Sequence, residues 1–285
     1  MIPVLESIAE MAALARGWSR SGERIGFVPT MGALHEGHLS LVRAARERAT
    51  KVVVSIFVNP LQFGKNEDFS RYPRDLDQDR ALLSTVGCDA IFAARADEMY
   101  PPNFVTNVVN SKLSVRFEGK ERPGHFDGVL TVVAKLFHIV GPDSAFFGQK
   151  DAQQALLIRS MVRDLHFPLE VVVCPILREP DGLAMSSRNV YLKGEDRIAA
   201  RVLSRALFAA RTAFARGESK RATLLAAARA ELNAEQRASV DYLDLVDPET
   251  LEDLTVCTPR GLLLLAARVG GTRLLDNLIL DESDR

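Results

Sequence analysis

Residues 28–38 read Val28-Pro29-Thr30-Met31-Gly32-Ala33-Leu34-His35-Glu36-Gly37-His38 and join a predicted strand to a predicted helix. Residues 24–28, apolar after Arg24, are typical of a short buried strand, and residues 39–46 space their apolar side chains three and four apart, as a helix does. Gly32 permits backbone conformations closed to other residues, and Gly37 permits close approach of a ligand or another chain. We therefore predict a strand-to-helix turn.

His35 and His38 are the candidate functional residues of this turn. Because they are three apart, they share a face of the first helical turn, where backbone N–H groups and the positive end of the helix dipole also lie. Two imidazoles at such a position predict a phosphate site. The alternatives are structural histidines, or half of a zinc site, which needs further ligands and has no cysteine nearby.

The first part of the chain alternates strands with helices. Residues 51–58 form a nearly unbroken β-branched run, typical of a parallel strand that is buried on both faces. The alternation predicts a parallel sheet with right-handed crossovers and a ligand at the carboxyl ends of the strands. Strands are expected at residues 24–28, 51–58, 89–92, 104–109, 144–147 and 169–174, helices at 4–20, 39–46, 75–86, 129–140 and 152–165, and a loop at 121–128.

The pattern changes near residue 176, where we place a domain boundary. The remainder is predicted to be a smaller α+β domain that could serve as a lid, with helices at 196–216 and 222–231 and strands at 240–246, 261–267 and 273–280. Arginine recurs in these helices, as it does in an RNA-binding face. Their Glu and Asp content favours a solvated surface instead.

Composition narrows the class of protein. A chain of 285 residues is long enough for two domains or one large one, and its net charge of −1 gives no basic field for nucleic acid. No apolar run reaches the roughly 20 residues of a membrane span, and the N-terminus lacks a signal-peptide pattern. The three cysteines indicate reduced, packed thiols. We expect a cytoplasmic protein without a nucleic-acid or membrane partner.

A second motif, Phe147-Gly148-Gln149-Lys150-Asp151, lies between a predicted strand and helix. Gly148 permits close approach of a ribose or phosphate, Lys150 can neutralise phosphate charge, and Asp151 can accept hydrogen bonds from ribose hydroxyls. The alternative is a helix N-cap at Asp151 beside a solvated Lys150. The predicted position at the sheet edge that carries the histidines favours the ligand site.

A third motif, Met185-Ser186-Ser187-Arg188-Asn189, offers two hydroxyls and a guanidinium in succession. Hydroxyls and arginine are suitable partners for the oxygens of a polyphosphate. The alternative is a turn with exposed polar side chains.

Further polar residues are candidates for a small substrate or a metal. Gln62 and Gln154 are neutral amides, which suit hydroxyls and a carboxylate, although either can be a surface residue. Arg122 and His125 flank Pro123-Gly124 and either reach a negative ligand or hold the loop. Asp77 and Asp79 lie at a predicted helix start and meet magnesium through water or form a solvated face.

These motifs resemble a known family. The segment His35-Glu36-Gly37-His38 resembles the His-x-Gly-His signature of the nucleotidylyltransferase superfamily, and the longer run from Pro29 to His38 resembles the pantothenate synthetases. Ala152 departs from the family, which often has an aromatic residue there. The other anchors are 58–64, 72–74, 122–126, 147–151 with 153–154, and 181–189.

The resemblance implies a fold and an activity. Members join (R)-pantoate to β-alanine with ATP, through pantoyl adenylate, and release pantothenate (a precursor of coenzyme A), AMP and pyrophosphate. They have a Rossmann-type parallel-sheet domain and a C-terminal α+β lid domain, and are usually homodimers. For this chain the resemblance implies an ATP- and pantoate-binding catalytic domain at 1–176, a lid at 177–285, and Mg²⁺ that arrives with ATP.

The resemblance also implies roles for individual residues. His38 would be the proton donor, acting with His35, Lys150 and Arg188. Gln62 would contact both pantoate and β-alanine, and Gln154 would hold pantoate. The remaining substrate-site candidates are Asn59, Tyr72, Arg122 and His125. ATP would be bound by Met31, Gly32, Ala33, Leu34, His35, Glu36, Gly37, His38, Gly148, Gln149, Lys150, Asp151, Leu177, Met185, Ser186, Ser187 and Arg188.

Two other functions are compatible with parts of this pattern. A plain nucleotidylyltransferase of a small acid would release a nucleotidylated product, and Gln62 and Gln154 argue against it because they imply a second substrate pocket. A catalytically silent nucleotide-binding regulator would tolerate loss of His38, Lys150 or Ser187, and all three are present.

Overall fold

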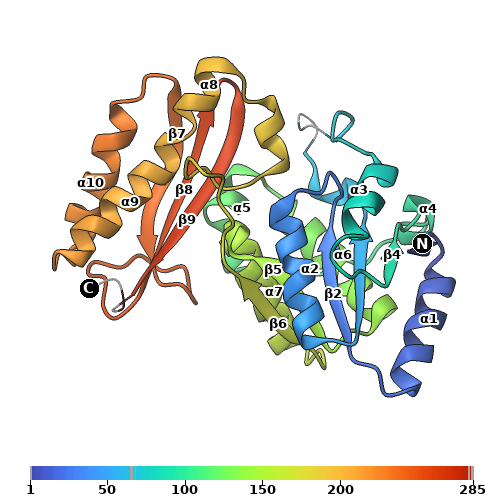
Figure 1. Cartoon of the computed structure of the whole chain (residues 1–285). Coiled ribbons are helices and arrows are strands. Elements are labelled where there is room, and N and C mark those ends of the chain that lie inside the picture. The colour runs from blue at the N-terminus through green and yellow to red at the C-terminus, as the bar shows by residue number, and fades with distance from the viewer. Residues whose placement is uncertain (1, 65–66, 68, 282, 284–285) are drawn as a thin grey trace. The chain divides into compact units, whose positions relative to one another are not determined.

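The computed structural model describes residues 2–64, 67, 69–281 and 283. The chain divides into two compact units (Figure 1). The first unit contains the residues up to Gly148 together with Gln153–Pro175, and the second contains Gln149–Ala152 and the residues from Ile176 onward. The short segment Gln149–Ala152 therefore belongs with the second unit, although it lies between a strand and a helix of the first.

The first unit contains a six-stranded sheet in the order β1-β4-β3-β2-β5-β6, and all its paired strands are parallel. From the central β2 the chain fills β3 and β4 on one side and then β5 and β6 on the other. The topological switch point, where such sheets bind ligands, therefore lies beside β2. The strands are β1 (Val4–Leu5), β2 (Ile25–Thr30), β3 (Lys51–Ile56), β4 (Ala90–Phe92), β5 (Ser144–Gly148) and β6 (Glu170–Cys174).

Helices cover both faces of this sheet (Figure 1). Phe27 belongs to the buried cluster that includes α6 and α7, whereas its neighbour Val28 belongs to the cluster that includes α2. Successive side chains of a strand point to opposite faces, so a strand covered on both sides must be apolar throughout. The helices are α1 (Ile8–Arg20), α2 (Glu36–Arg48), α3 (Leu76–Leu83), α4 (Ala96–Met99), α5 (Glu118–Glu121), α6 (His125–Val140) and α7 (Ala152–Asp164).

Three details of the first unit differ from the sequence prediction. Residues 104–109 form no strand: Val105 is 85% exposed, and the Val108 N–H donates to Thr131 Oγ1 at 2.9 Å instead of to a neighbouring strand. Residues 4–5 pair with β4 as β1, so the first helix begins only at Ile8. The helix expected from residue 129 begins at His125, which therefore lies on a helix and not in a loop.

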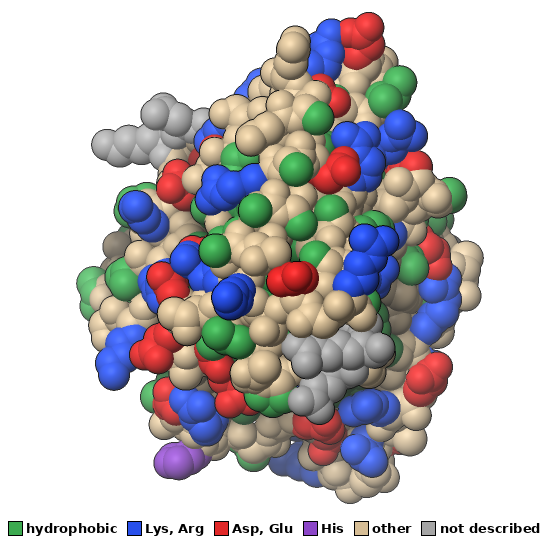
Figure 2. Space-filling model, turned by 90° about the vertical axis from the view of Figure 1, so that its left-hand side faces the viewer, with side chains coloured by type: hydrophobic (Ala, Val, Ile, Leu, Met, Phe, Trp, Pro, Cys, Tyr) green, Lys and Arg blue, Asp and Glu red, His purple; other side chains and the backbone are tan. Residues whose placement is uncertain are grey.

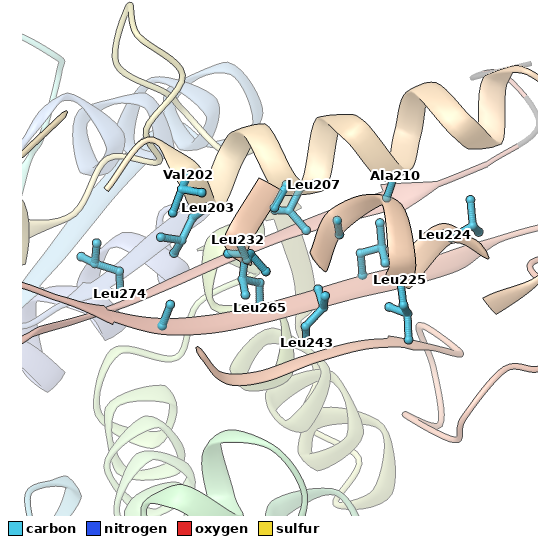
Figure 3. Close-up of a cluster of buried hydrophobic side chains, with 14 of the residues drawn as sticks. Val202, Leu203, Leu207, Ala210, Leu224, Leu225, Leu232, Leu243, Leu265 and Leu274 are labelled. Carbon is cyan, nitrogen blue, oxygen red and sulfur yellow. The ribbon is translucent and has the colours of Figure 1, made fainter. Parts of the chain in front are cut away.

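The second unit contains an antiparallel sheet in the order β7-β8-β9, against which two helices pack. Figure 3 shows Leu207 and Leu224 from the helices and Leu243 and Leu265 from the strands in one apolar cluster. The helix expected at 196–216 is two helices, and neither glycine nor proline marks the break. The elements are α8 (Gly194–Ala199), α9 (Val202–Ala215), α10 (Arg221–Asn233), β7 (Ala238–Val246), β8 (Gly261–Val269) and β9 (Thr272–Leu280).

The surface and the thiols follow ordinary patterns. All three cysteines are buried and unbridged, which confirms a packing role. Lys and Arg side chains are interspersed with Asp and Glu on the face shown in Figure 2, and Arg205 pairs with Glu231 between α9 and α10. Such alternation is typical of a solvated surface. None of the helices in the described part of the chain has the length and apolarity required to cross a membrane.

Candidate functional site

A buried carboxylate holds the turn that follows β2. Asp79 of α3 is 2% exposed, and its two oxygens accept hydrogen bonds from the Ala33 N–H at 3.0 Å and the Leu34 N–H at 2.7 Å. Ala33 has a positive φ of 52°, a strained conformation that these bonds stabilise. Gly32 has a φ of +82°, and a Cβ there would lie 2.9 Å from Asp79 Oδ2, so this position requires glycine. Burial raises the pKa of Asp79, although the two N–H groups oppose the shift.

His35 and His38 lie at the start of α2. The Nδ1 atom of His35, the N-cap residue, accepts from the Gly37 N–H at 3.1 Å, and the Nδ1 atom of His38 accepts from the His35 N–H at 3.3 Å. A neutral imidazole whose Nδ1 accepts carries its proton on Nε2, so both rings offer an Nε2–H donor. The ring centroids are 4.1 Å apart. Two adjacent donors at a helix N-terminus form a site suited to an anion.

Glu36 and Gly37 of the same motif form the first turn of α2. The Glu36 carboxylate pairs with Arg43 on an exposed part of that helix. The side chain of Glu36 therefore contributes to the helix surface, while the backbone of the turn provides the N–H groups of the candidate site.

Asn59 and Gln62 follow β3 at a short 3-10 helix, η1 (Pro60–Gln62), and both are buried. Asn59 Nδ2 donates to Gln62 Oε1 at 3.0 Å, and Gln62 Nε2 donates to Met31 Sδ at 3.0 Å. The structure therefore brings together three predicted site residues from the ends of β2 and β3.

Arg122 and His125 form a second cluster around the backbone of Gln62. His125 Nδ1 lies 2.8 Å from the Gln62 carbonyl oxygen, and the Arg122 guanidinium contacts His125 Nε2 at 3.0 Å. Since the carbonyl only accepts and the guanidinium only donates, the neutral ring carries its proton on Nδ1. Burial, reinforced by the Arg122 charge, lowers the pKa of His125 to about 4.

Glu67 also belongs to this cluster. Arg122 donates to its two carboxylate oxygens at 2.7 and 2.6 Å. Burial opposes ionisation of Glu67, but the hydrogen bond and charge of Arg122 outweigh it and lower the pKa of this carboxyl. A substrate carboxylate that binds Arg122 must therefore compete with Glu67.

The other predicted residues of the first unit are placed separately. Tyr72 is buried, with its ring centroid 6.0 Å from that of Phe63, and Gln154 is half-buried in the first turn of α7. Asp77 is exposed on α3, whereas the carboxylate of Asp79 is directed to the turn. Among the residues that the structure describes, no group of three His, Cys, Asp or Glu side chains is placed to hold a metal ion.

The second unit holds the 3-10 helix η3 (Gln149–Asp151) through Asn277 of β9. The buried Asn277 amide donates to the carbonyl oxygens of Gln149 at 2.9 Å and Lys150 at 2.8 Å, and it accepts from Gln149 Nε2 at 3.0 Å. Lys150 Nζ lies 3.6 Å from Asp151 Oδ1. Gly148, the last residue of β5, remains in the first unit.

A pocket in the second unit contains several of the predicted phosphate-binding groups. Arg178 makes a bidentate ion pair with the buried Asp276, at 2.7 and 2.9 Å, beside this pocket. Bidentate pairing fixes the plane of the guanidinium as well as its position. The polar side chains that line the pocket are Lys150, Ser186, Arg188, Asn189, Arg273 and Asp276.

The motif at 185–188 is held against the segment that follows β6. The Met185 N–H donates to the Leu177 carbonyl at 3.0 Å, and Ser186 Oγ accepts from the Arg188 N–H at 3.3 Å. Ser187 is half-buried and begins a 3-10 helix, η4 (Ser187–Tyr191). Part of the hydrogen-bonding capacity of the Leu177 carbonyl is therefore used within the unit.

Sequence reasoning missed the residues that support the site. Asp276 and Asn277 are adjacent polar residues inside a largely apolar strand, and this interruption is the signal that could have found them. Glu67 is 55 residues from Arg122, its partner, and nothing local connects the two.

Comparisons with known proteins identify the family of this chain. Residues 3–279 match the model of the family described as pantoate-beta-alanine ligase. The pantothenate synthetase of Acidobacterium capsulatum is 55% identical over 98% of this chain and 97% of its own length. The crystal structure of pantothenate synthetase from Thermus thermophilus is 50% identical, covers 97% of this chain and 99% of its own, and has a TM-score of 0.92.

A third similar protein was solved with ligands. This pantoate-beta-alanine ligase from Francisella tularensis was complexed with beta-gamma ATP and beta-alanine. It is 33% identical, covers 98% of this chain and 97% of its own, and has a TM-score of 0.81.

Proposed function

The chain belongs to the pantoate–beta-alanine ligase family, and on that premise we propose that it joins (R)-pantoate to β-alanine with ATP, forming pantothenate, AMP and pyrophosphate. The observation that carries the proposal is the pair of neutral imidazoles at the N-terminus of α2, each with an Nε2–H donor. Phosphoryl oxygens gain negative charge as the α-phosphorus is attacked, and fixed N–H donors stabilise that charge.

The reaction has two steps in this proposal. A pantoate carboxylate oxygen attacks the α-phosphorus, the bond to the bridging oxygen breaks, and pyrophosphate leaves. The amine of β-alanine then attacks the carbonyl carbon of pantoyl adenylate, AMP leaves with the C–O electron pair, and the nitrogen loses its proton. An amine does not displace oxide from a carboxylate, so the acid must first gain a better leaving group.

The residues take the following roles. His38 is the proton donor toward the phosphoryl oxygens, with His35 beside it on the phosphates. Lys150 and Arg188 stabilise phosphoryl charge in the transition state. Gln62 contacts pantoate and β-alanine, and Gln154 holds pantoate. The remaining residues proposed to line the substrate site are Asn59, Tyr72, Arg122 and His125. ATP is bound by residues 31–38, 148–151, Leu177 and 185–188.

Mg²⁺ enters the proposal with the phosphates of ATP, whose hard oxygens this cation prefers. Asp77, which is exposed, is its candidate partner through water. Asp79, the other residue that the sequence suggested, is buried and its two oxygens already hold the Ala33 and Leu34 N–H groups, so it is a poor partner for a hydrated ion. We further assign ATP and pantoate binding to residues 1–176 and a lid to 177–285, and we place a homodimer in the cytoplasm. Family resemblance supports these assignments.

Product analysis tests the activity. Purified protein with Mg-ATP, pantoate and β-alanine should yield equimolar pantothenate, AMP and pyrophosphate. Release of ADP would contradict an adenylation, and a nucleotidylated acid that persists with β-alanine present would indicate a plain nucleotidylyltransferase.

Isotope exchange tests the order of steps. Enzyme, Mg-ATP and pantoate without β-alanine should exchange labelled pyrophosphate into ATP, and Gln154→Ala should weaken this exchange because pantoate is no longer held in line with the α-phosphorus. If an enzyme that makes pantothenate shows no exchange without β-alanine, a concerted route replaces the adenylate.

A further inference from the structure

The Asn59 side chain uses every hydrogen-bonding position of its amide. Oδ1 accepts from the Tyr100 hydroxyl at 2.8 Å and from the Leu61 N–H at 3.3 Å, and Nδ2 donates to the Gly128 carbonyl at 3.0 Å and to Gln62 Oε1 at 3.0 Å. An amide offers two donors and two acceptor positions, so this 1% exposed group is fully satisfied. If the amide were rotated by half a turn, its NH₂ group would face the Leu61 N–H and its oxygen would face the Gly128 carbonyl oxygen. Its orientation is therefore determined.

The orientation of Asn59 determines that of Gln62. Because Asn59 Nδ2 is a donor, the Gln62 atom that faces it is the oxygen, and Gln62 Nε2 is directed to Met31 Sδ at 3.0 Å. A thioether is a weak acceptor. A carboxylate or hydroxyl oxygen of a substrate is a stronger acceptor, so the Gln62 N–H group is oriented to donate to such an oxygen.

Tyr100 supplies the hydroxyl that completes this arrangement. It follows α4 and is 41 residues from Asn59 in sequence. Its ring packs near Phe57 and Phe104, with centroid distances of 6.2 and 5.1 Å, and Lys135 Nζ lies 5.7 Å from its centroid. Burial raises the pKa of the phenol, so it remains protonated and able to donate at physiological pH.

The remaining anchor comes from close packing of α6 on η1. A Cβ on Gly128 would lie 2.4 Å from the Leu61 carbonyl oxygen, so only glycine allows this approach. The Gly128 carbonyl is thereby placed within reach of Asn59 Nδ2. Neither Gly128 nor Tyr100 is among the residues to which the sequence motifs point.

We propose that Tyr100 is a positioning residue: through Asn59 it holds the Gln62 amide with its N–H group directed to the acid substrate. The role rests on the proposed function for the identity of that substrate. Gln62 then selects a ligand that presents oxygen acceptors to it, and it disfavours one that presents an ammonium group at the same point.

The first test is Tyr100→Phe, which removes the hydroxyl and keeps the ring. Loss of one hydrogen bond should raise the KM for pantoate about fivefold, while the KM for ATP changes less than twofold. Phe104→Leu is the matched control, because it alters packing around Tyr100 without removing the hydroxyl, and its KM for pantoate should stay near the wild-type value. Equal increases in the KM for both substrates in Tyr100→Phe would indicate a merely structural role and overturn the proposal.

A double-mutant cycle tests whether the effect passes through Gln62. In a Gln62→Ala background, Tyr100→Phe should cause no further rise in the KM for pantoate. The same fivefold rise in both backgrounds would overturn the proposal.

The chemistry of Gln62 is tested by two replacements at pH 8. Gln62→Glu retains the acceptor for Asn59 but replaces the donor with a carboxylate, so it should weaken pantoate binding more than Gln62→Met does. The reverse order would show that Gln62 meets the substrate as an acceptor.

A readout without turnover separates this proposal from the proposed function. The Gln62 side-chain amide signal in the NMR spectrum, identified by its loss in Gln62→Ala, should shift in Tyr100→Phe and stay in place in Phe104→Leu. An unmoved signal in Tyr100→Phe overturns the positioning role whatever the enzyme makes. A wild-type enzyme that forms no pantothenate, with the signal shifted, contradicts the proposed function alone.

Discussion

The two units hold their candidate site residues by different kinds of contact. In the first, three of the candidate donors are neutral: the imidazoles of His35 and His38 are oriented by backbone N–H groups, and Gln62 is oriented by an amide. In the second, Lys150 and Arg188 line a pocket beside a bidentate ion pair. Neutral donors depend on direction, whereas cations act through charge over a longer range. The first set should therefore be sensitive to small changes of geometry, and the second to ionic strength.

The largest effect is expected at the histidines. His38→Ala, and separately His35→Ala, should lower kcat by about 10²–10³-fold, as loss of one fixed donor to a developing oxyanion typically does. The fold should survive because both residues lie at a helix start and not in a core. Steady-state kinetics together with thermal unfolding check both statements, and a near-normal rate in either variant would exclude a phosphate role for that residue.

Acid should destabilise the first unit, because its neutral His125 ring must take up a proton. The His125 ring binds a proton in the unfolded chain below pH 6.5 but in the folded chain only below about pH 4, so the unfolded state binds more protons between these values. The contribution of His125 to the free energy of unfolding should therefore be fully present above pH 6.5. As the pH falls towards 4, the free energy of unfolding should decrease by about 3 kcal/mol. Chemical unfolding at pH 4.5–7.5 measures this slope. It should be smaller in His125→Gln, and equal slopes would contradict the assignment.

Replacement of Lys150 tests the role of the cations in the second unit. Its compact charge should stabilise the transition state more than bound ATP, so Lys150→Ala should lower kcat about 10²-fold with a smaller rise in the KM for ATP. Salt should raise the KM for ATP of the wild type more than that of the variant, because salt screens the Lys150 charge and the variant lacks that charge. Unchanged kcat with weakened ATP binding would leave Lys150 as a binding contact.

The smallest effect is expected at Asp79. Asp79→Asn keeps one oxygen to accept from the turn, but its NH₂ group faces the other backbone N–H, and two donors cannot bond to each other. The free energy of unfolding should therefore fall by about 2 kcal/mol. The KM for ATP should rise, because Ala33 and Leu34 belong to the proposed ATP-binding turn. Asp77→Asn is the matched control, since Asp77 is exposed on the same helix. Equal stability of the two variants would show that the two N–H bonds contribute little.

The sequence by itself determined the parallel sheet, the strands of the second, α+β unit and the strand-to-helix turn. Periodicity and turn residues are local properties of the chain, and the apolar runs of β2, β3, β5 and β6 show them strongly. It also determined the family, because the signature run and five separated motifs occur in order. The same reasoning was wrong at 104–109, where valines occur without a strand partner.

Only the tertiary structure decided how the site residues are held. The Asp79 cap on the turn, the Tyr100 hydroxyl on Asn59 and the placement of Gln149–Ala152 with the second unit join residues far apart in sequence. No periodicity encodes such pairs, since a hydrogen bond depends on where the backbone carries each group. The tautomers of His35 and His125 were decided in the same way, by whether the nearest partner donates or accepts.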